Sequence, residues 1–171
     1  FSGYGQFRVE DYRKPDFQVT ITSLQPEKQD RFVHGEQVRV QVNTAYYFGE
    51  PVAGAKLQAE IFYDYPIQTS ITGNLTTDEQ GNTVLSFKAL YRDSYSYWWD
   101  SGKQRLRLQV SADDGSHQKV VGLFYFDVYP STDQVRMDTG GYYAQPNSPV
   151  TVNISDVDLF GQPVAGRDLT L

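Results

Sequence analysis

The sequence predicts an all-β protein built from β-sandwich domains. Apolar and polar residues alternate along most of the chain, which is the pattern of strands with one face in a core and one in water. Aromatic residues make up 15% of the chain, largely through its 13 tyrosines, and this composition favours strands. Turn-forming residues separate the alternating runs at roughly ten-residue spacing, as they do in sandwiches.

Four runs alternate clearly between apolar and polar residues. They predict strands around residues 17–21, 38–42, 57–63 and 106–110. A fifth run, 120–129, differs because it is apolar on both faces. One face carries Val121, Leu123 and Tyr125, and the other carries Val120, Phe124 and Phe126. We expect a central strand that is covered on both sides, or a strand that meets a neighbouring domain.

Turn signals separate the predicted strands. The clearest lies at 78–81, where the residues are Asp-Glu-Gln-Gly. Aspartate at the first position and glycine at the fourth are typical of a type I turn. The segments Gly49-Glu50-Pro51, Asp113-Asp114-Gly115 and Ser101-Gly102 mark further turns.

Composition argues against several classes of function. The formal net charge is −6 and the basic residues form no run, so no nucleic-acid partner is expected. No apolar run approaches the ~20 residues that a membrane helix needs, so we expect no membrane span in this chain. Cysteine is absent, which removes disulfides, zinc–thiolate sites, thiol nucleophiles and a thioester from this chain. No cofactor is expected.

An internal repeat is the most informative feature of the sequence. The element Phe-Gly-x-Pro-Val-Ala-Gly occurs at 48–54 and again at 160–166, an offset of 112 residues from Phe48 to Phe160. The strand before it repeats at the same offset. Val38, Val40 and Val42 correspond to Val150, Val152 and Ile154. The offset is the size of one immunoglobulin-like sandwich, so we expect tandem domains of that kind.

The repeat sets the expected domain boundaries. The chain begins with Phe1 rather than Met, and we expect a piece of a longer protein with one complete domain and parts of two others. Residues 1–14 would be the last strand of a preceding domain, 15–130 a complete sandwich, and 131–171 the N-terminal part of the next domain. The partial sandwich would leave apolar strand faces uncovered, and exposed sheet edges invite pairing between molecules.

The repeated element and the histidines each have a simple structural interpretation. The Phe-Gly-x-Pro-Val-Ala-Gly element lacks the helix and the Lys-Ser/Thr pair of a phosphate loop, so we interpret it as a connection between strands. His34 and His117 lack the spacing of metal ligands, and no nucleophile-elbow pattern accompanies them. We expect both to be solvated loop residues, and we assign no catalytic residue.

Two groups of carboxylates raise the possibility of calcium between domains. They are Asp113-Asp114 and the pair Asp156 and Asp158. Calcium needs six to eight oxygen ligands, and no Asp/Asn-rich loop of twelve residues accompanies either group. We therefore assign no metal site.

The most unusual local composition is an aromatic stretch. It contains Tyr91, Tyr95, Tyr97, Trp98 and Trp99. Exposed aromatic side chains stack on sugars or form contacts with other proteins. Aromatic residues in loops more often cover the ends of cores, and this is the interpretation that we favour. The competing hypothesis is that some of these side chains touch a neighbouring domain or a partner.

Several segments together resemble bacterial α2-macroglobulins. The segment 7–19, Phe-Arg-Val-Glu-Asp-Tyr-Arg-Lys-Pro-Asp-Phe-Gln-Val, is similar to the junction between two macroglobulin-like domains of that family. So are the segment 46–57, the turn 77–81 and the second Phe-Gly-Gln-Pro-Val-Ala-Gly element at 160–166. The resemblance covers essentially the whole chain. It implies tandem fibronectin-like macroglobulin domains, one complete and two partial.

The resemblance also implies a function. Proteins of this family inhibit proteases by trapping: a protease cuts a bait segment, the molecule rearranges, and a thioester captures the protease. This chain has no counterpart of the family's Cys-x-Glu-Gln thioester motif, and no bait segment can be assigned. The resemblance implies a non-enzymatic scaffold segment of a broad-spectrum protease inhibitor in the periplasm, in the cell envelope or outside the cell. Its partners would be neighbouring macroglobulin-like domains and, through the longer protein, target proteases.

A rival interpretation is a β-sandwich module of a cell-surface adhesin or carbohydrate-binding protein. The aromatic stretch would then bind a glycan. An accessory glycosidase or peptidase is disfavoured, because no pair of carboxylates stands at convincing positions. Glycan binding by the chain would favour the adhesin, whereas a Cys-x-Glu-Gln motif elsewhere in the longer protein would favour the trap.

Overall fold

The structure is a computed structural model that describes residues 16–63, 68–71, 73, 75–92, 102–116, 119–141, 143 and 145–168. These residues form ten strands and one short 3₁₀ helix, so the prediction of an all-β fold is confirmed. In chain order the elements are β1 (Phe17–Ser23), η1 (Pro26–Lys28), β2 (Arg31–Val33), β3 (Gln37–Tyr46), β4 (Lys56–Phe62), β5 (Gln68–Ile71), β6 (Asn82–Lys88), β7 (Gln104–Asp113), β8 (Lys119–Tyr129), β9 (Asp133–Asp138) and β10 (Asn153–Asp158). No helix among the described residues is long and apolar enough to cross a membrane.

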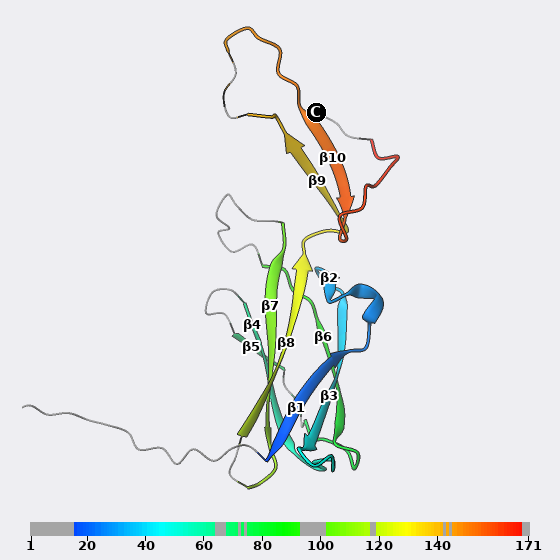
Figure 1. Ribbon diagram of the computed structural model, residues 1–171, viewed down its shortest axis with the longest axis vertical. Helices are drawn as coiled ribbons and strands as arrows, with labels where there is room; N and C mark the ends of the chain where they lie inside the picture. Colours follow the sequence, from blue (N-terminus) through cyan, green and yellow to red (C-terminus); the bar gives the residue numbers. More distant parts are fainter. Residues whose placement is uncertain are drawn as a thin grey trace, which may run out of the picture.

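Strands β1 to β8 form two sheets, and we call this unit the sandwich (Figure 1). One sheet has the order β1-β3-β6 and the other the order β2-β8-β7-β4-β5. Among the described strands, the pairing of β2 with β8 is parallel and the others are antiparallel. β9 and β10 form a separate two-stranded sheet, which we call the hairpin. The chain enters the sandwich at one end, where β1 begins, and leaves at the opposite end, where β8 leads into β9 (Figure 1).

The core of the sandwich lies between the inward faces of the two sheets. The alternating runs predicted these faces correctly. Val38, Val40 and Val42 of β3 are fully buried, and so are Leu108 and Val110 of β7. Burying a side chain of this size stabilises the fold by about 1.5–3 kcal/mol.

A cluster of phenylalanines ties the two sheets together. The ring of Phe126 on β8 lies 6.1 Å from the ring of Phe32 on β2, in an edge-to-face arrangement. It also lies 5.6 Å from the ring of Phe87 on β6. Because β6 and β8 belong to different sheets, Phe126 packs across the core. Aromatic pairs of this geometry contribute about 0.5–1.5 kcal/mol beyond the area that they bury.

Two buried threonines fix the end of the sandwich where residues 47–55 connect β3 to β4. The hydroxyl of Thr44 lies within hydrogen-bond distance of the carbonyl oxygens of Val52 (3.0 Å) and Gly81 (3.2 Å). The hydroxyl of Thr77 donates to the same Val52 carbonyl at 2.7 Å and accepts from the Ala55 N–H at 2.9 Å. Both buried hydroxyls therefore have backbone partners, as buried polar groups require.

The turn predicted at 78–81 is confirmed. The Gly81 N–H donates to the Asp78 carbonyl oxygen at 3.0 Å, and Gly81 has a φ of 72°. The Asp78 Oδ1 accepts from the N–H groups of Gln80 (2.9 Å) and Asn82 (2.7 Å). A Cβ on Gly81 would lie 2.3 Å from the Thr44 carbonyl oxygen, so close approach to β3 requires glycine here in addition to the positive φ.

The strand β8 is covered on one face only within the described chain. Phe124 and Phe126 are buried in the core, whereas Val121, Leu123 and Tyr125 on the outer face are 49%, 45% and 46% exposed. Among the described residues, the expectation that residues 120–129 are covered on both sides is therefore wrong, because none of them forms a second layer over the outer face. Contact of that face with a neighbouring domain stays a prediction.

Gly122 allows β1 to pass β8 at close range. A Cβ built on Gly122 would lie 2.7 Å from Val19 Cγ1 and 2.8 Å from the Val19 carbonyl oxygen. Side chains do not approach backbone atoms so closely, and any larger residue would push β1 away from β8. The contact joins the edge strand of the three-stranded sheet to the other sheet along one side of the sandwich.

We expect Gly122→Ala to destabilise the chain by about 1–3 kcal/mol, because the added methyl group overpacks the contact between β1 and β8. Urea denaturation followed by fluorescence measures the change in the free energy of unfolding. Gly141→Ala is the matched control, because a Cβ there meets the Tyr143 carbonyl oxygen at an ordinary 3.9 Å. Equal stability of the two variants would contradict the close packing at Gly122.

Candidate functional site at the junction of the sandwich and the hairpin

The junction between the sandwich and the hairpin brings together residues that are far apart in the sequence. β8 ends at Tyr129 and β9 begins at Asp133, so residues 130–132 link the two units. The last residues of β8 are paired with β7 on one side and with β2 on the other, with Arg31 opposite Asp127. A short linker that leaves a strand paired on both sides restricts the orientations open to the hairpin.

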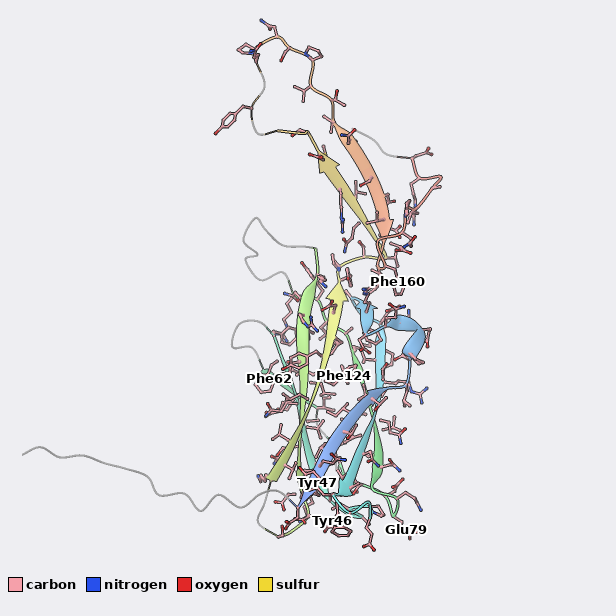
Figure 2. All side chains as sticks on the ribbon, in the orientation of Figure 1. Tyr46, Tyr47, Phe62, Glu79, Phe124 and Phe160 are labelled. Atoms are coloured by element: carbon pink, nitrogen blue, oxygen red, sulfur yellow. The ribbon has the colours of Figure 1, made fainter. Side chains whose placement is uncertain are left out.

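Arg31 connects the two units directly. Its Nη1 donates to the Leu159 carbonyl oxygen at 3.3 Å, and its guanidinium lies 5.1 Å from the centre of the Phe160 ring. Leu159 and Phe160 lie in the turn after β10, and Figure 2 shows Phe160 at the end of the hairpin nearest the sandwich. A guanidinium over an aromatic face contributes about 0.5–1 kcal/mol at an exposed site.

Charged residues surround the end of β8 beside this contact. The Asp127 carboxylate lies 2.5 Å from Lys103 Nζ and 4.0 Å from Arg105 Nε. Burial raises the pKa of Asp30, and the negative charge of Asp127 raises it further. Lys103 and Arg105 thus pair with Asp127 within the sandwich, beside Arg31. Ion pairs that remain partly exposed add little stability.

The same backbone hydrogen bonds build both copies of the repeated element. In the sandwich they join Gly49 N to Tyr46 O (2.9 Å), Tyr46 N to Glu50 O (2.8 Å) and Val52 N to Thr44 O (3.0 Å). In the hairpin they join Gly161 N to Asp158 O (3.0 Å), Asp158 N to Gln162 O (2.9 Å) and Val164 N to Asp156 O (2.9 Å). The repeat in the sequence is therefore a repeat of structure, and the element is a connection between strands, as its turn residues predicted.

Several apolar side chains in and beside the hairpin face solvent. Val135 and Met137 of β9 are 55% and 63% exposed. Val152 is 42% exposed, whereas Val40, the residue that corresponds to it in the sandwich, is fully buried. In the sandwich such residues are covered by a second sheet, and the described part of the hairpin has none.

The structure describes one residue of the predicted aromatic contact. Tyr95, Tyr97, Trp98 and Trp99 lie outside the described residues, as does His117. Tyr91 is partly buried against the core, and its N–H donates to Nδ1 of His34, an exposed residue as expected. Just after the stretch, a Cβ built on Gly102 would lie 3.6 Å from Gln134 Nε2 of β9. The flank of the aromatic stretch therefore lies beside the hairpin.

Three of the four carboxylates considered for calcium, Asp113, Asp114 and Asp158, accept hydrogen bonds within turns. Asp113 Oδ1 accepts from the Gly115 N–H at 2.8 Å, and Asp114 Oδ1 accepts from the Ser116 N–H at 2.9 Å. Asp158 Oδ1 likewise accepts two backbone N–H bonds, both at 2.8 Å, in the turn after β10. Across the ranges that the structure describes, no three potential ligands group so that they could hold a metal ion.

Arginine–aromatic contacts that sequence reasoning missed lie on and beside the outer face of the five-stranded sheet. The guanidinium groups lie above the rings at 4.6 Å for Arg107 and Phe62, 5.7 Å for Arg105 and Tyr125, and 4.5 Å for Arg92 and Tyr63. Phe62, Arg105 and Tyr125 are among the side chains that line a shallow depression on the surface of the sheet. Each pair joins two segments that are neighbours in space but not in the sequence, so no spacing of residues in the sequence could have indicated it.

Comparison with known proteins decides the family. No protein-family model matches the chain. The α2-macroglobulin of Thermotoga maritima is 31% identical to it over 169 residues, which is 95% of this chain. The chain matches a fragment of the α2-macroglobulin family. It spans 10% of the length of that relative.

Solved structures of bacterial α2-macroglobulins share its fold. The Escherichia coli protein in its native conformation matches with a TM-score of 0.57 at 15% identity, over 91% of this chain and 11% of that one. Salmonella α2-macroglobulin reacted with methylamine matches with a TM-score of 0.57 at 16% identity, over 92% of this chain and 12% of that one. The all-β macroglobulin-like architecture that the resemblance implied is therefore confirmed.

We expect Arg31 and Phe160 to be energetically coupled. In a double-mutant cycle of Arg31→Ala and Phe160→Ala, the coupling should be about 0.5–1 kcal/mol, because each substitution removes the same cation–π contact. Urea denaturation of the four proteins measures it. The matched control cycle combines Arg31→Ala with Phe48→Ala, whose ring stacks on Tyr46 in the other copy of the repeat. Equal coupling in the two cycles would show that the contact is not specific.

Proposed function

We propose that this chain is a scaffold segment of a bacterial α2-macroglobulin-like protease trap, with no catalytic activity of its own. The observation that carries the proposal is its 31% identity to the T. maritima α2-macroglobulin over 95% of the chain. The E. coli relative has been solved after activation by trypsin and by porcine elastase. Because this chain contains no cysteine, a thioester of the trap would have to lie elsewhere in the longer protein.

The scaffold role rests on a division of the chain into modules. We propose that residues 1–14 end a preceding macroglobulin-like module, that 15–130 form a complete one, and that 131–171 begin the next. The closed core of the sandwich and the exposed apolar faces of the hairpin support this division. The direct partners of the chain would be neighbouring modules, and target proteases would be engaged through the longer protein. Folding of an isolated 15–130 segment, measured by thermal melting, tests the central boundary.

We further propose that Tyr91, Tyr95, Tyr97, Trp98 and Trp99 form a contact with a neighbouring module. The position of Gly102 beside Gln134 supports this, because Gly102 follows the stretch closely in the sequence and lies next to the hairpin. Unchanged stability of the Trp98→Ala chain, together with unchanged assembly of the longer protein, would overturn the idea. The longer protein is proposed to be extracytoplasmic, in the periplasm or cell envelope or secreted. Its recovery in the cytosolic fraction alone would contradict that placement.

The trapping proposal is tested on the longer protein that contains this chain. It is mixed with a broad-specificity protease, and cleavage of a small fluorogenic peptide and of a large protein substrate is measured side by side. We expect cleavage of the large substrate to be lost while cleavage of the peptide is kept, because a trapped protease remains active but is sterically enclosed.

The isolated 171-residue chain is the control, and it should leave both activities unchanged. Retention of both activities in the presence of the longer protein would contradict the trapping proposal. Binding of the chain on a glycan array would then support the interpretation as an adhesin module. Loss of both activities would indicate an inhibitor that blocks the active site of the protease, which is a different mechanism from trapping.

A further inference from the structure

The end of the sandwich at which β1 begins exposes an aromatic turn. Phe48 is 73% exposed and Tyr47 is 58% exposed. The ring of Phe48 stacks on Tyr46 at 5.2 Å, so it is held in place although it faces solvent. The Tyr47 N–H donates to the Asp16 carbonyl oxygen at 3.2 Å, which places the turn beside the point where the chain enters the sandwich. Figure 2 shows Tyr46 and Tyr47 at the opposite end of the sandwich from Phe160.

The second copy of this turn shows what such an aromatic residue does. Phe160 corresponds to Phe48, and the same backbone hydrogen bonds hold both turns. Phe160 lies beside the start of β9, just as Phe48 lies beside the start of β1. It contacts the unit that precedes it in the chain, through the guanidinium of Arg31, and its exposure is 41%. Phe48 has the same turn geometry and no such cover among the described residues.

The charge around Phe48 suits a basic partner. Asp114 accepts a hydrogen bond from the Tyr46 hydroxyl at 3.5 Å. Burial raises the pKa of Tyr46, and the negative charges of Asp114, Asp16 and Glu50 raise it further, so the field at this ring is negative. An exposed aromatic ring beside negative charge attracts a guanidinium both through the ring and through ion pairing.

We propose that the Phe48 turn is a docking surface for a macroglobulin-like module that precedes this one, which presents a basic side chain to Phe48 as Arg31 presents one to Phe160. The inference rests on the proposed function, since it requires a preceding module. A second copy of the chain fits less well, because the end that carries its Arg31 is already occupied by its own Phe160. The same turn would then set the angle at each successive module junction.

Photo-cross-linking of the longer protein tests the proposal. Phe48 is replaced by p-benzoylphenylalanine, which keeps an aromatic ring at the same position, and the irradiated protein is digested and mapped by mass spectrometry. We expect the adduct on a segment of the longer protein that precedes Phe1 of this chain, and we therefore expect it to be lost in the 171-residue chain. Adducts between two copies, an adduct that persists in the 171-residue chain, or no adduct would each overturn the proposed occupant.

The matched control places p-benzoylphenylalanine at Phe160. Its adduct should map to the peptide that contains Arg31, in the longer protein and in the 171-residue chain alike. Failure of this control would overturn the premise that the repeated turn docks on the preceding unit. The outcome is independent of trapping. A Phe48 adduct without enclosure of the protease would support the docking surface and contradict the proposed function. Enclosure of the protease without a Phe48 adduct would support the proposed function and contradict the docking surface.

Discussion

The carbonyl oxygen of Val52 is the point on which the sandwich depends, because hydroxyls from two separate segments converge on it. Thr44 belongs to one sheet and Thr77 precedes the strand that returns to it, and both are buried. Leaving a buried hydroxyl or N–H without a partner costs about 1–3 kcal/mol, so these groups strongly prefer one arrangement. They thereby fix the connection from β3 to β4, the turn before β6, and the position at which Phe48 is presented.

The hairpin contains the same turn without these anchors. Asp156 stands where the sandwich has Thr44, and its Oδ1 is buried without a hydrogen-bond partner among the described residues. Its turn is instead closed locally, since the Asp158 carboxylate accepts the N–H groups of Phe160 and Gln162. Local bonds are thus enough to shape the repeated element. The tertiary bonds that lock it belong to a complete sandwich.

Features that depend on neighbours in the sequence could be predicted, and features that depend on contacts across the fold could not. The strand faces of β3 and the turn that ends at Gly81 follow from alternation and turn chemistry, which are local. Arg31 lies 128 residues from Leu159, and nothing near it in the sequence marks a partner. Gly122 signals a close approach within a strand, but not that β1 makes it. The sequence shows that both faces of β8 are apolar, but it does not show which face is covered, because the positions of other strands decide that.

The direction in which the chain crosses the sandwich has a mechanical consequence. The chain enters where β1 begins and leaves at the far end of β8, which is paired with β7 along its length and with β2 at its exit (Figure 1). Tension between the two ends therefore pulls β8 along its own axis, across hydrogen bonds that run sideways to it. Such a load is shared by many bonds at once instead of opening them one by one. A sandwich that the chain crosses from end to end in this way transmits a displacement from one end to the other before its strands separate.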